Sequence, residues 1–407
     1  MILRRLPGLV CKYKFVSLSF IFLLALVLYS LLSWGVICTN LEPWAHINQM
    51  CEDFRKRESF GDLCHALCAE KGIESLSCHP FHAGKEIVFS ATLRGGNKVF
   101  VKSSNRGGEP AEVFHWVDSE GKEHYPSEEQ FTMMVSDAVR LRLNISIDKE
   151  DAKRLAHFPG GQTTSNHDSE LRYMEMREVW ALLQHQGYLM SMVHAEKEFF
   201  PELVGSCGQY FATEYLSPAL GTTVVSGDSS KFESWASRVH LAVSIIELIE
   251  QMDLENIILC DMKLTHFGIN SNGKLKFLDL SVALPKTIAD AMTSNGKPCA
   301  EDSDCYFHDC KSVCSKDSKV CESPITNTNL QMVCEKILLG WALPGRLILP
   351  GLLMTSQTPQ SLVSLLRQCA QVIHGQHPEE REVAKHVAQR LTDTLTELDN
   401  SLEGFRS

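Results

Sequence analysis

The chain has 407 residues, of which 15 are cysteine, with 44% hydrophobic residues and a formal net charge of −11. This acidic balance, with no basic stripe interleaved with aromatic residues, argues against nucleic acid as a partner. The part beyond the first forty residues is long enough for one two-lobed domain or for two ordinary domains with a substantial core.

An uncharged run near the N-terminus, residues 15–38, predicts a membrane anchor. At about 1.5 Å per residue in a helix, it is long enough to cross a hydrocarbon layer of ~30 Å. Bulky residues continue to its end, so we expect a retained anchor and not a cleaved signal peptide. Basic residues precede the run and none follows closely, which predicts a cytosolic tail (1–14), one transmembrane helix and a type II topology.

Thirteen of the 15 cysteines lie beyond residue 50, on the predicted far side of the membrane. Cysteines there predict disulfides, because no glutathione pool reduces them. Asn144 lies in an Asn-Ile-Ser sequon, which can be glycosylated only on that same side. Residues 51–78 show little apolar periodicity, so we expect a cysteine-rich lumenal cap over 39–80. Its disulfide-forming cysteines are expected to be Cys51, Cys64, Cys68 and Cys78.

From Lys85 onward, short apolar runs and periodic helices alternate along the chain. The apolar stretch 337–354 is interrupted by Pro344 and Pro350, so we do not expect a second membrane span there. We expect a hairpin over 87–102, helices over 127–143, 174–193 and 232–252, two strand-like pieces over 199–216, short strands over 257–260 and 275–278, and a helical tail over 329–402.

Three residues in order along the chain carry the chemistry of phosphoryl transfer: Lys102, Asp261 and Asp279. This reaction needs an ammonium for the nucleotide phosphates, a carboxylate for the acceptor hydroxyl and oxygen ligands for magnesium. Lys102 ends one strand, and the two aspartates follow the two short strands that come after a long helix. Taken singly, each has a simpler explanation as a solvated lysine or a turn-forming aspartate. The ordered set predicts a nucleotide site.

Four longer stretches are characteristic: Leu259–Lys263, Trp180–Gln184, Asn329–Gln331 with Cys334, and the cysteine block Cys299–Cys321. Together they resemble the divergent protein kinase domain 1 family. The resemblance covers nearly the whole chain and implies a cysteine-rich, single-pass type II protein of the endoplasmic reticulum membrane. It also implies an α+β fold of two kinase-like lobes with a degenerate EF-hand inserted in the N-lobe. We therefore expect an N-lobe over 81–211, its insertion over 127–180, and a C-lobe over 212–400 with a cysteine cluster at 299–321.

By this resemblance, Lys102 would bind phosphate and Asp261 would be the catalytic aspartate. Asp279 would be the metal aspartate. The glutamate that pairs with Lys102 would be Glu178, with Glu175 as the alternative. The cofactors implied are ATP with magnesium or manganese.

The chain also departs from the kinase pattern. Five residues after Asp261, where kinases carry a magnesium-binding asparagine, it has His266, a doubtful ligand because magnesium prefers oxygen. The sequence has no Gly-rich loop before Lys102 and no A-P-E segment. We therefore expect a pseudokinase or weakly active kinase that binds nucleotide, a protein partner or both. The alternatives are an active secretory-pathway kinase acting on lumenal proteins, and a non-catalytic cysteine-rich interaction or receptor-type module.

The resemblance places a calcium loop before Trp180, with Asn166, Asp168 and Glu175 at ligand positions. This loop has a threonine in place of the first carboxylate and a serine in place of the turn glycine. We expect a structural remnant that does not bind calcium.

The cysteine block has two interpretations, a zinc site and a set of disulfides. No C-x-x-C pair occurs and the compartment is oxidising, which favours disulfides. Cys260, beside Asp261, is open to another interpretation as a small buried hydrophobic residue. The disulfide-forming residues expected here are Cys299, Cys305, Cys310, Cys314, Cys321 and Cys334.

Overall fold

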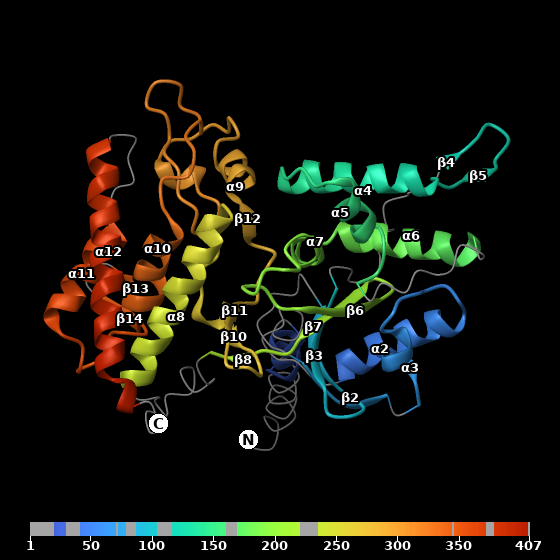
Figure 1. Ribbon diagram of the computed structural model, residues 1–407, viewed down its shortest axis with the longest axis horizontal. Helices are drawn as coiled ribbons and strands as arrows, with labels where there is room; N and C mark the ends of the chain where they lie inside the picture. Colours follow the sequence, from blue (N-terminus) through green and yellow to red (C-terminus); the bar gives the residue numbers. More distant parts are fainter. Residues whose placement is uncertain are drawn as a thin grey trace, which may run out of the picture. The chain divides into compact units, whose positions relative to one another are not determined.

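A computed structural model shows the chain as two compact units (Figure 1). The first takes residues 1–127, 156–185 and 203–215, and the second takes 128–155, 186–202 and 216–407. The described residues are 20–29, 41–70, 72–78, 87–103, 116–159, 169–219, 235–343, 346–371 and 378–405.

The first unit is built on a five-stranded antiparallel sheet with the strand order β1-β2-β3-β7-β6. The predicted hairpin is β2 with β3, and its turn uses Gly95 and Gly96 at φ values of 99° and 83°, where a side chain would be strained. A separate small hairpin joins β4 (Trp116–Val117) to β5 (Glu123–His124). The five strands are β1 (Ile73–Cys78), β2 (Ile87–Leu93), β3 (Lys98–Ser103), β6 (Leu203–Cys207) and β7 (Tyr210–Glu214).

Two N-terminal helices, α2 (Leu41–Arg55) and α3 (Cys64–Cys68), share an apolar core with this sheet. Ile47 of α2 and Leu67 of α3 are buried in one cluster with Phe89 of β2. This corrects the expected cap over 39–80, because that segment supplies a strand of the sheet and part of its core. Cys51 and Cys64 are buried in this core, and the sequence alone does not distinguish core cysteines from those of a disulfide-stapled cap.

The helix α6 (Ser169–Leu183) also belongs to the first unit. The expected helix over 174–193 is in fact two helices, since α7 (Gln186–Val193) is separate and belongs to the second unit. The helices α4 (Glu128–Leu143) and α5 (Lys149–Leu155) pack on each other and also belong to the second unit. The expected insertion over 127–180 is therefore divided between the two units.

The second unit is organised around α8 (Trp235–Leu254), which was predicted from its periodicity. Val239, Ile246 and Ile249 are buried on it at helical spacing. The helix packs against α12 (Pro378–Ser401) and against the short strands β9 (Ile257–Leu259) and β11 (Leu275–Phe277). These contacts fix the strands whose ends carry Asp261 and Asp279.

The expected helical tail over 329–402 contains a hairpin. A short helix α10 (Asn329–Met332) runs into the π-helix η5 (Val333–Leu339), and then β13 (Gly340–Leu343) pairs with β14 (Arg346–Pro350). Gly340, at a φ of 89°, ends the helical run. Helix returns with α11 (Gln360–Gln371), which packs on η5 and α12.

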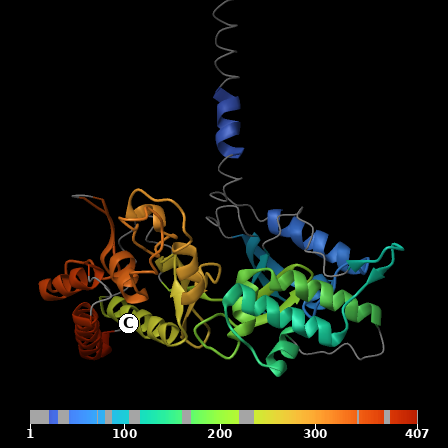
Figure 2. The same cartoon turned by 90° about the horizontal axis from the view of Figure 1, so that it is seen from above.

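Residues 20–29 form a helix (Figure 2). Nine large hydrophobic side chains are exposed on it. Among the helices that the structure describes, none combines the length and the apolar character needed to cross a bilayer. The rest of the predicted 15–38 span and the tail 1–14 lie outside the described residues.

Candidate functional site: an Asp-His-Asp group after two short strands

Two short strand pairs in the second unit position the candidate site. β9 pairs with β12 (Ala283–Pro285), while β10 (Phe267–Ile269) pairs with β11 and with β8 (Ser217–Pro218). Asp261 follows β9, His266 ends the 3₁₀ turn η3 (Leu264–His266), and Asp279 follows β11. Because β10 and β11 form a hairpin, the two aspartates that enclose it in the sequence return to the same place.

The structure brings one ligand atom each of Asp261, His266 and Asp279 within 4.8 Å of one another. All three lie in the second unit and are partly exposed. The two carboxylates, which the sequence predicts to share one cleft, therefore form one group with the imidazole.

The Asp261 carboxylate has a cationic neighbour. Nζ of Lys263 lies 2.5 Å from its Oδ2, and the lysine side chain is 59% exposed. An exposed lysine can move away from this carboxylate at small cost, since such ion pairs contribute little in water.

The imidazole of His266 is held at one edge and faces a carboxylate at the other. Its Nδ1 lies 3.0 Å from the backbone oxygen of Asp261, and its Nε2 lies 3.6 Å from Oδ2 of Asp279. Burial lowers the pKa of His266, although the nearby carboxylates of Asp279 and Asp261 act in the opposite direction. The backbone of His266 also accepts a hydrogen bond from the amide of Leu278, which ties η3 to the end of β11.

Asp279 is oriented by a residue that the sequence analysis did not single out. Ser281 donates to Oδ1 of Asp279 from its hydroxyl, at 2.6 Å, and from its backbone amide, at 3.2 Å. These two bonds direct the other oxygen, Oδ2, toward His266. An aspartate that accepts from the backbone amide two residues later forms an Asx turn, and here the Ser281 hydroxyl adds a second bond.

A disulfide and an aspartate support the loop on its other side. Cys260 is bonded to Cys310, so the alternative interpretation of Cys260 as an unpaired hydrophobic residue is wrong. Asp309 donates its amide to the Cys260 oxygen at 2.7 Å and accepts from the Met262 amide at 2.8 Å. Asn327 donates to the backbone oxygen of Asp309. Asp261 thus sits on a segment fixed by covalent and hydrogen bonds on both flanks.

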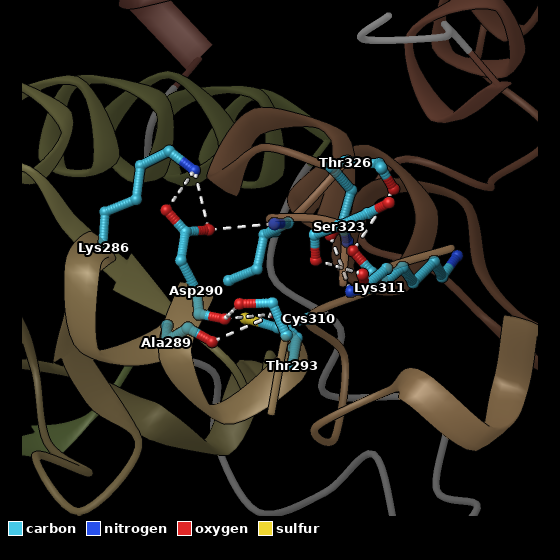
Figure 3. Close-up of polar contacts among 12 residues, drawn as sticks. Lys286, Ala289, Asp290, Thr293, Cys310, Lys311, Ser323 and Thr326 are labelled. Atoms are coloured by element: carbon cyan, nitrogen blue, oxygen red, sulfur yellow. Dashed lines mark hydrogen bonds and ion pairs between the residues drawn. The ribbon is translucent and has the colours of Figure 1, made fainter. Parts of the chain in front are cut away.

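The chain beyond Cys310 is anchored in turn to α9 (Lys286–Thr293) and to a later loop (Figure 3). Asp290 of α9 faces the ammonium of Lys286 at 3.3 Å and accepts from the Ile325 amide at 2.9 Å. Thr326 donates its amide and its hydroxyl to the Lys311 oxygen. The cysteine block is therefore a fixed part of the second unit and supports the loop of Asp261.

All ten cysteines expected to form disulfides are disulfide-bonded in the structure. Cys207 and Cys369, which were not named beforehand, supply partners for Cys64 and Cys334. Connectivity is not readable from a sequence, so only the structure could assign the pairs. The pairs between described residues are Cys51–Cys68, Cys64–Cys207, Cys260–Cys310, Cys299–Cys314, Cys305–Cys321 and Cys334–Cys369.

Lys102 lies in the first unit, on β3, where its cross-strand neighbours are Val88 and Phe211. Val99 and Val101 belong to the core formed with α2 and α3, so the alternation of a strand places Lys102 on the opposite face. The ring of His185, just after α6, contacts Phe211 edge-on at 4.9 Å. The end of α6 therefore covers the face of the sheet that carries Lys102.

The two candidate partners of Lys102 are both on α6, and each has another cation beside it. Glu178 is buried and accepts from Arg177 at 2.8 Å, while burial raises its pKa. Glu175 is 1% exposed and pairs with Arg172 at 2.8 Å. Convergence of Lys102 with the two aspartates of the second unit stays a prediction.

The expected calcium loop is not built as the sequence predicted. Ser169, assigned to the turn position of the loop, begins α6. The last ligand, Glu175, binds His157 at 3.2 Å as well as Arg172, and also accepts from the Phe158 amide. Both of its oxygens are therefore satisfied by protein donors. The other two predicted ligands, Asn166 and Asp168, lie outside the described residues.

These features define a class of protein. A lysine on the third strand of an antiparallel sheet, a helix over the same face, and two aspartates after short strands are the parts of a protein-kinase-like domain. Comparison with family models gives the same class: residues 179–372 match the protein-kinase domain of FAM69, and residues 4–156 match the N-terminal cysteine-rich ER region of FAM69. The chain belongs to the FAM69 family, which confirms the resemblance seen in its sequence. The match to a kinase domain also counts against the third alternative, a cysteine-rich interaction or receptor-type module that has no kinase fold.

The family implies ATP with magnesium, and the residues fit that ion only in part. Asp279 offers a carboxylate oxygen, which suits magnesium. His266 presents a nitrogen where kinases have the amide oxygen of an asparagine. The donor set therefore differs from one built for magnesium, and this difference bears on function.

Proposed function

We propose that this chain is a lumenal, membrane-anchored, kinase-like protein that binds nucleotide and is a pseudokinase or a weakly active kinase. The observation that carries the proposal is the side chain at the fifth position after Asp261. His266 replaces the oxygen ligand there and closes onto Asp279. A domain with the kinase aspartates but without that oxygen keeps the means to bind a nucleotide and loses part of the means to transfer its phosphate.

The roles of the chain's own residues follow from their chemistry. A divalent ion, when bound with the nucleotide, would neutralise the phosphate charge. Asp261 would accept a hydrogen bond from an acceptor hydroxyl, and Lys263 would offset charge beside it. Lys102 would hold phosphate oxygens. None of these roles is removed by His266, which is why weak activity is part of the proposal.

Nucleotide binding is tested by thermal shift of the full chain in detergent with ATP and either Mg²⁺ or Mn²⁺. We expect stabilisation that is lost in Asp279→Asn. A shift that is equal in this variant and in the wild type would mean that the nucleotide binds elsewhere. No shift at any nucleotide concentration would contradict nucleotide binding.

The alternative is an active kinase that acts on lumenal proteins. Measuring the rate of phosphate transfer distinguishes it from a pseudokinase. Phosphate transfer that falls at least ~100-fold in Asp261→Asn would establish it, since positioning and general base roles together are worth at least that much. Transfer that is absent in the wild type and restored in His266→Asn would instead establish a pseudokinase limited by that position.

The membrane anchor and the topology are part of the proposal. Their support is the exposed apolar helix of residues 20–29 and the charge difference across the 15–38 run. Asn144 follows α4 and is exposed, so its sequon is accessible to a glycosyltransferase. A glycosidase-sensitive mass shift that disappears in Asn144→Gln would place this residue in the lumen. Cleavage of the large domain by a protease added to intact microsomes would contradict the topology.

A further inference from the structure

We infer that Asp261, His266 and Asp279 form a binding site for a divalent transition-metal ion, and that this site binds Zn²⁺ in preference to Mg²⁺. The inference deepens the proposed function, on which it rests for its biological use. Its geometry concerns three side chains of the second unit only.

The first step is the tautomer of His266. A backbone carbonyl oxygen can only accept, so the 3.0 Å contact between Nδ1 and the Asp261 oxygen requires the proton on Nδ1. In the neutral ring, Nε2 then carries a lone pair. Histidines that bind metals nearly always donate their other ring N–H to a carbonyl or carboxylate in this way.

The second step is what Nε2 faces. Oδ2 of Asp279 lies 3.6 Å away, which is longer than a hydrogen bond. At this distance a lone pair on Nε2 and the carboxylate oxygen repel unless a positive charge, a proton or a metal ion, lies between them. Ser281 already satisfies Oδ1 of the same carboxylate, so Oδ2 is the oxygen left to take such a charge.

The third step is the size of the space. With metal bonds of about 2.1 Å to nitrogen and oxygen, neighbouring ligands lie about 3.4 Å apart in a tetrahedral site and about 3.0 Å apart in an octahedral one. The observed 3.6 Å between Nε2 and Oδ2 is closer to the tetrahedral value. Asp261 completes a set of three donors within 4.8 Å, and a water or phosphate oxygen can take the fourth position.

The donor types then select the ion. Imidazole nitrogen suits Zn²⁺ and its first-row neighbours, whereas Mg²⁺ and Ca²⁺ prefer oxygen ligands. Zn²⁺ also ranks above Mn²⁺ for a given nitrogen and oxygen site. The expected order is therefore Zn²⁺, Mn²⁺, Mg²⁺.

Among the described residues, the other group with metal-ligand atoms close together, and the carboxylate of the expected calcium loop, have no ligand atom available for an ion. Cys299, Cys305 and Cys314 lie together but are all in disulfides, so they offer no thiolate. Glu175 has both oxygens bonded by protein donors. The competitor at the open site is Lys263, which an ion must displace from Asp261.

The test is calorimetric titration of the full chain, in detergent and without a polyhistidine tag, with ZnCl₂, MnCl₂ and MgCl₂ and no nucleotide. We expect one site for Zn²⁺ that weakens at least ~10-fold in His266→Asn, because losing a ligand costs at least as much as losing its supporting contacts. Mg²⁺ should bind more tightly to this variant than to the wild type. Lys263→Met should bind Zn²⁺ more tightly, because the competing cation is gone.

The matched control is His240→Asn. His240 also pairs with an aspartate, Asp399, in the second unit, at 3.1 Å. This variant should bind Zn²⁺ as the wild type does. Equal Zn²⁺ affinity in the wild type, His266→Asn and Asp279→Asn would overturn the inference, as would wild-type binding of Mg²⁺ as tight as that of Zn²⁺. A folding defect in one variant is detected by its circular dichroism, and the other variant then decides.

The two proposals fail differently. If Zn²⁺ binds but nucleotide does not raise the melting temperature, the metal site is supported and the proposed nucleotide binding is contradicted. A nucleotide shift that needs Mg²⁺, with no Zn²⁺ site at His266, would leave the proposed function and remove the inference.

Discussion

A carboxylate lies beside a histidine in both units of this protein, and the two pairs are built in opposite ways. In the first unit, Glu175 is 1% exposed, and its two oxygens are taken by His157 and Arg172. In the second unit, Asp279 is 30% exposed, and its Oδ2 faces the lone-pair side of His266. The sequence places metal-ligand residue types at both, but it predicts a remnant that does not bind calcium at Glu175.

The two carboxylates differ in whether protein cations already neutralise them. We call Glu175 with His157 and Arg172 the closed pair, and Asp279 with His266 the open pair. A buried carboxylate that already has a guanidinium and an imidazole stabilises the fold and has no oxygen left for an ion. A partly exposed carboxylate facing a neutral nitrogen contributes little to stability and attracts a cation. The two pairs can therefore be told apart by what their removal does.

The largest effect is expected from opening the closed pair. Arg172→Ala leaves Glu175 buried without its main counter-charge, and we expect the free energy of unfolding to fall by about 3–5 kcal/mol. Urea titration of the purified chain measures this loss. Recovery of the lost stability on adding Ca²⁺ would mean that Glu175 is a calcium ligand, against its contacts in the structure.

The second effect comes from the support of the open pair. Cys260→Ser with Cys310→Ser removes a bridge across 50 residues, and the chain-entropy argument gives a loss of about 4 kcal/mol at most. We expect hydrogen exchange to rise at residues 260–266 and to stay unchanged in α6. Unchanged exchange at 260–266 would mean that Asp309 alone holds the loop.

A smaller effect is expected from the open pair itself. Asp279→Asn keeps the bonds from Ser281 and removes one charge from a partly exposed group, so the free energy of unfolding should change by no more than about 1 kcal/mol. Urea titration at matched ionic strength checks this. A loss as large as that of Arg172→Ala would end the distinction between the two pairs.

The smallest effect is the acid response of the closed pair. Burial alone would raise the pKa of Glu175, but His157 and Arg172 outweigh it and hold the pKa below the ordinary value of 4.5. A carboxyl with a lowered pKa contributes stability above pH 4.5, and this is lost as the pH falls through its folded-state value. Glu175→Gln should therefore flatten the decline in melting temperature below pH 4.5. An unchanged decline would mean that other carboxylates cause it.

The sequence predicted those parts of the fold that have a strong local pattern. The β2–β3 hairpin, the helix α8 and the two aspartates after short strands follow from apolar spacing and turn residues. The approach of Asp261 to Asp279 followed as well, because a hairpin returns its two ends to one place, whereas His266 was expected only as a doubtful ligand.

Other parts depend on contacts that a local pattern does not contain. Cys51 occupies one of the buried positions of α2, where a disulfide cysteine conceals the core-forming character of the helix. The strand in the 39–80 segment is recognised only when it pairs with β2. The partners of Glu175 come from α6 itself and from a segment 18 residues earlier. Ser281 was not singled out because its role depends on which oxygen of Asp279 is left over.

The bridge between Cys64 and Cys207 spans 143 residues. A ribosome needs roughly 7–30 seconds to add that length of chain. During this interval Cys64 has no native partner, while Cys51 and Cys68, only 17 residues apart, are both already made. The first unit can therefore be completed only after β6 has been synthesised, and a thiol must be kept from wrong partners until then.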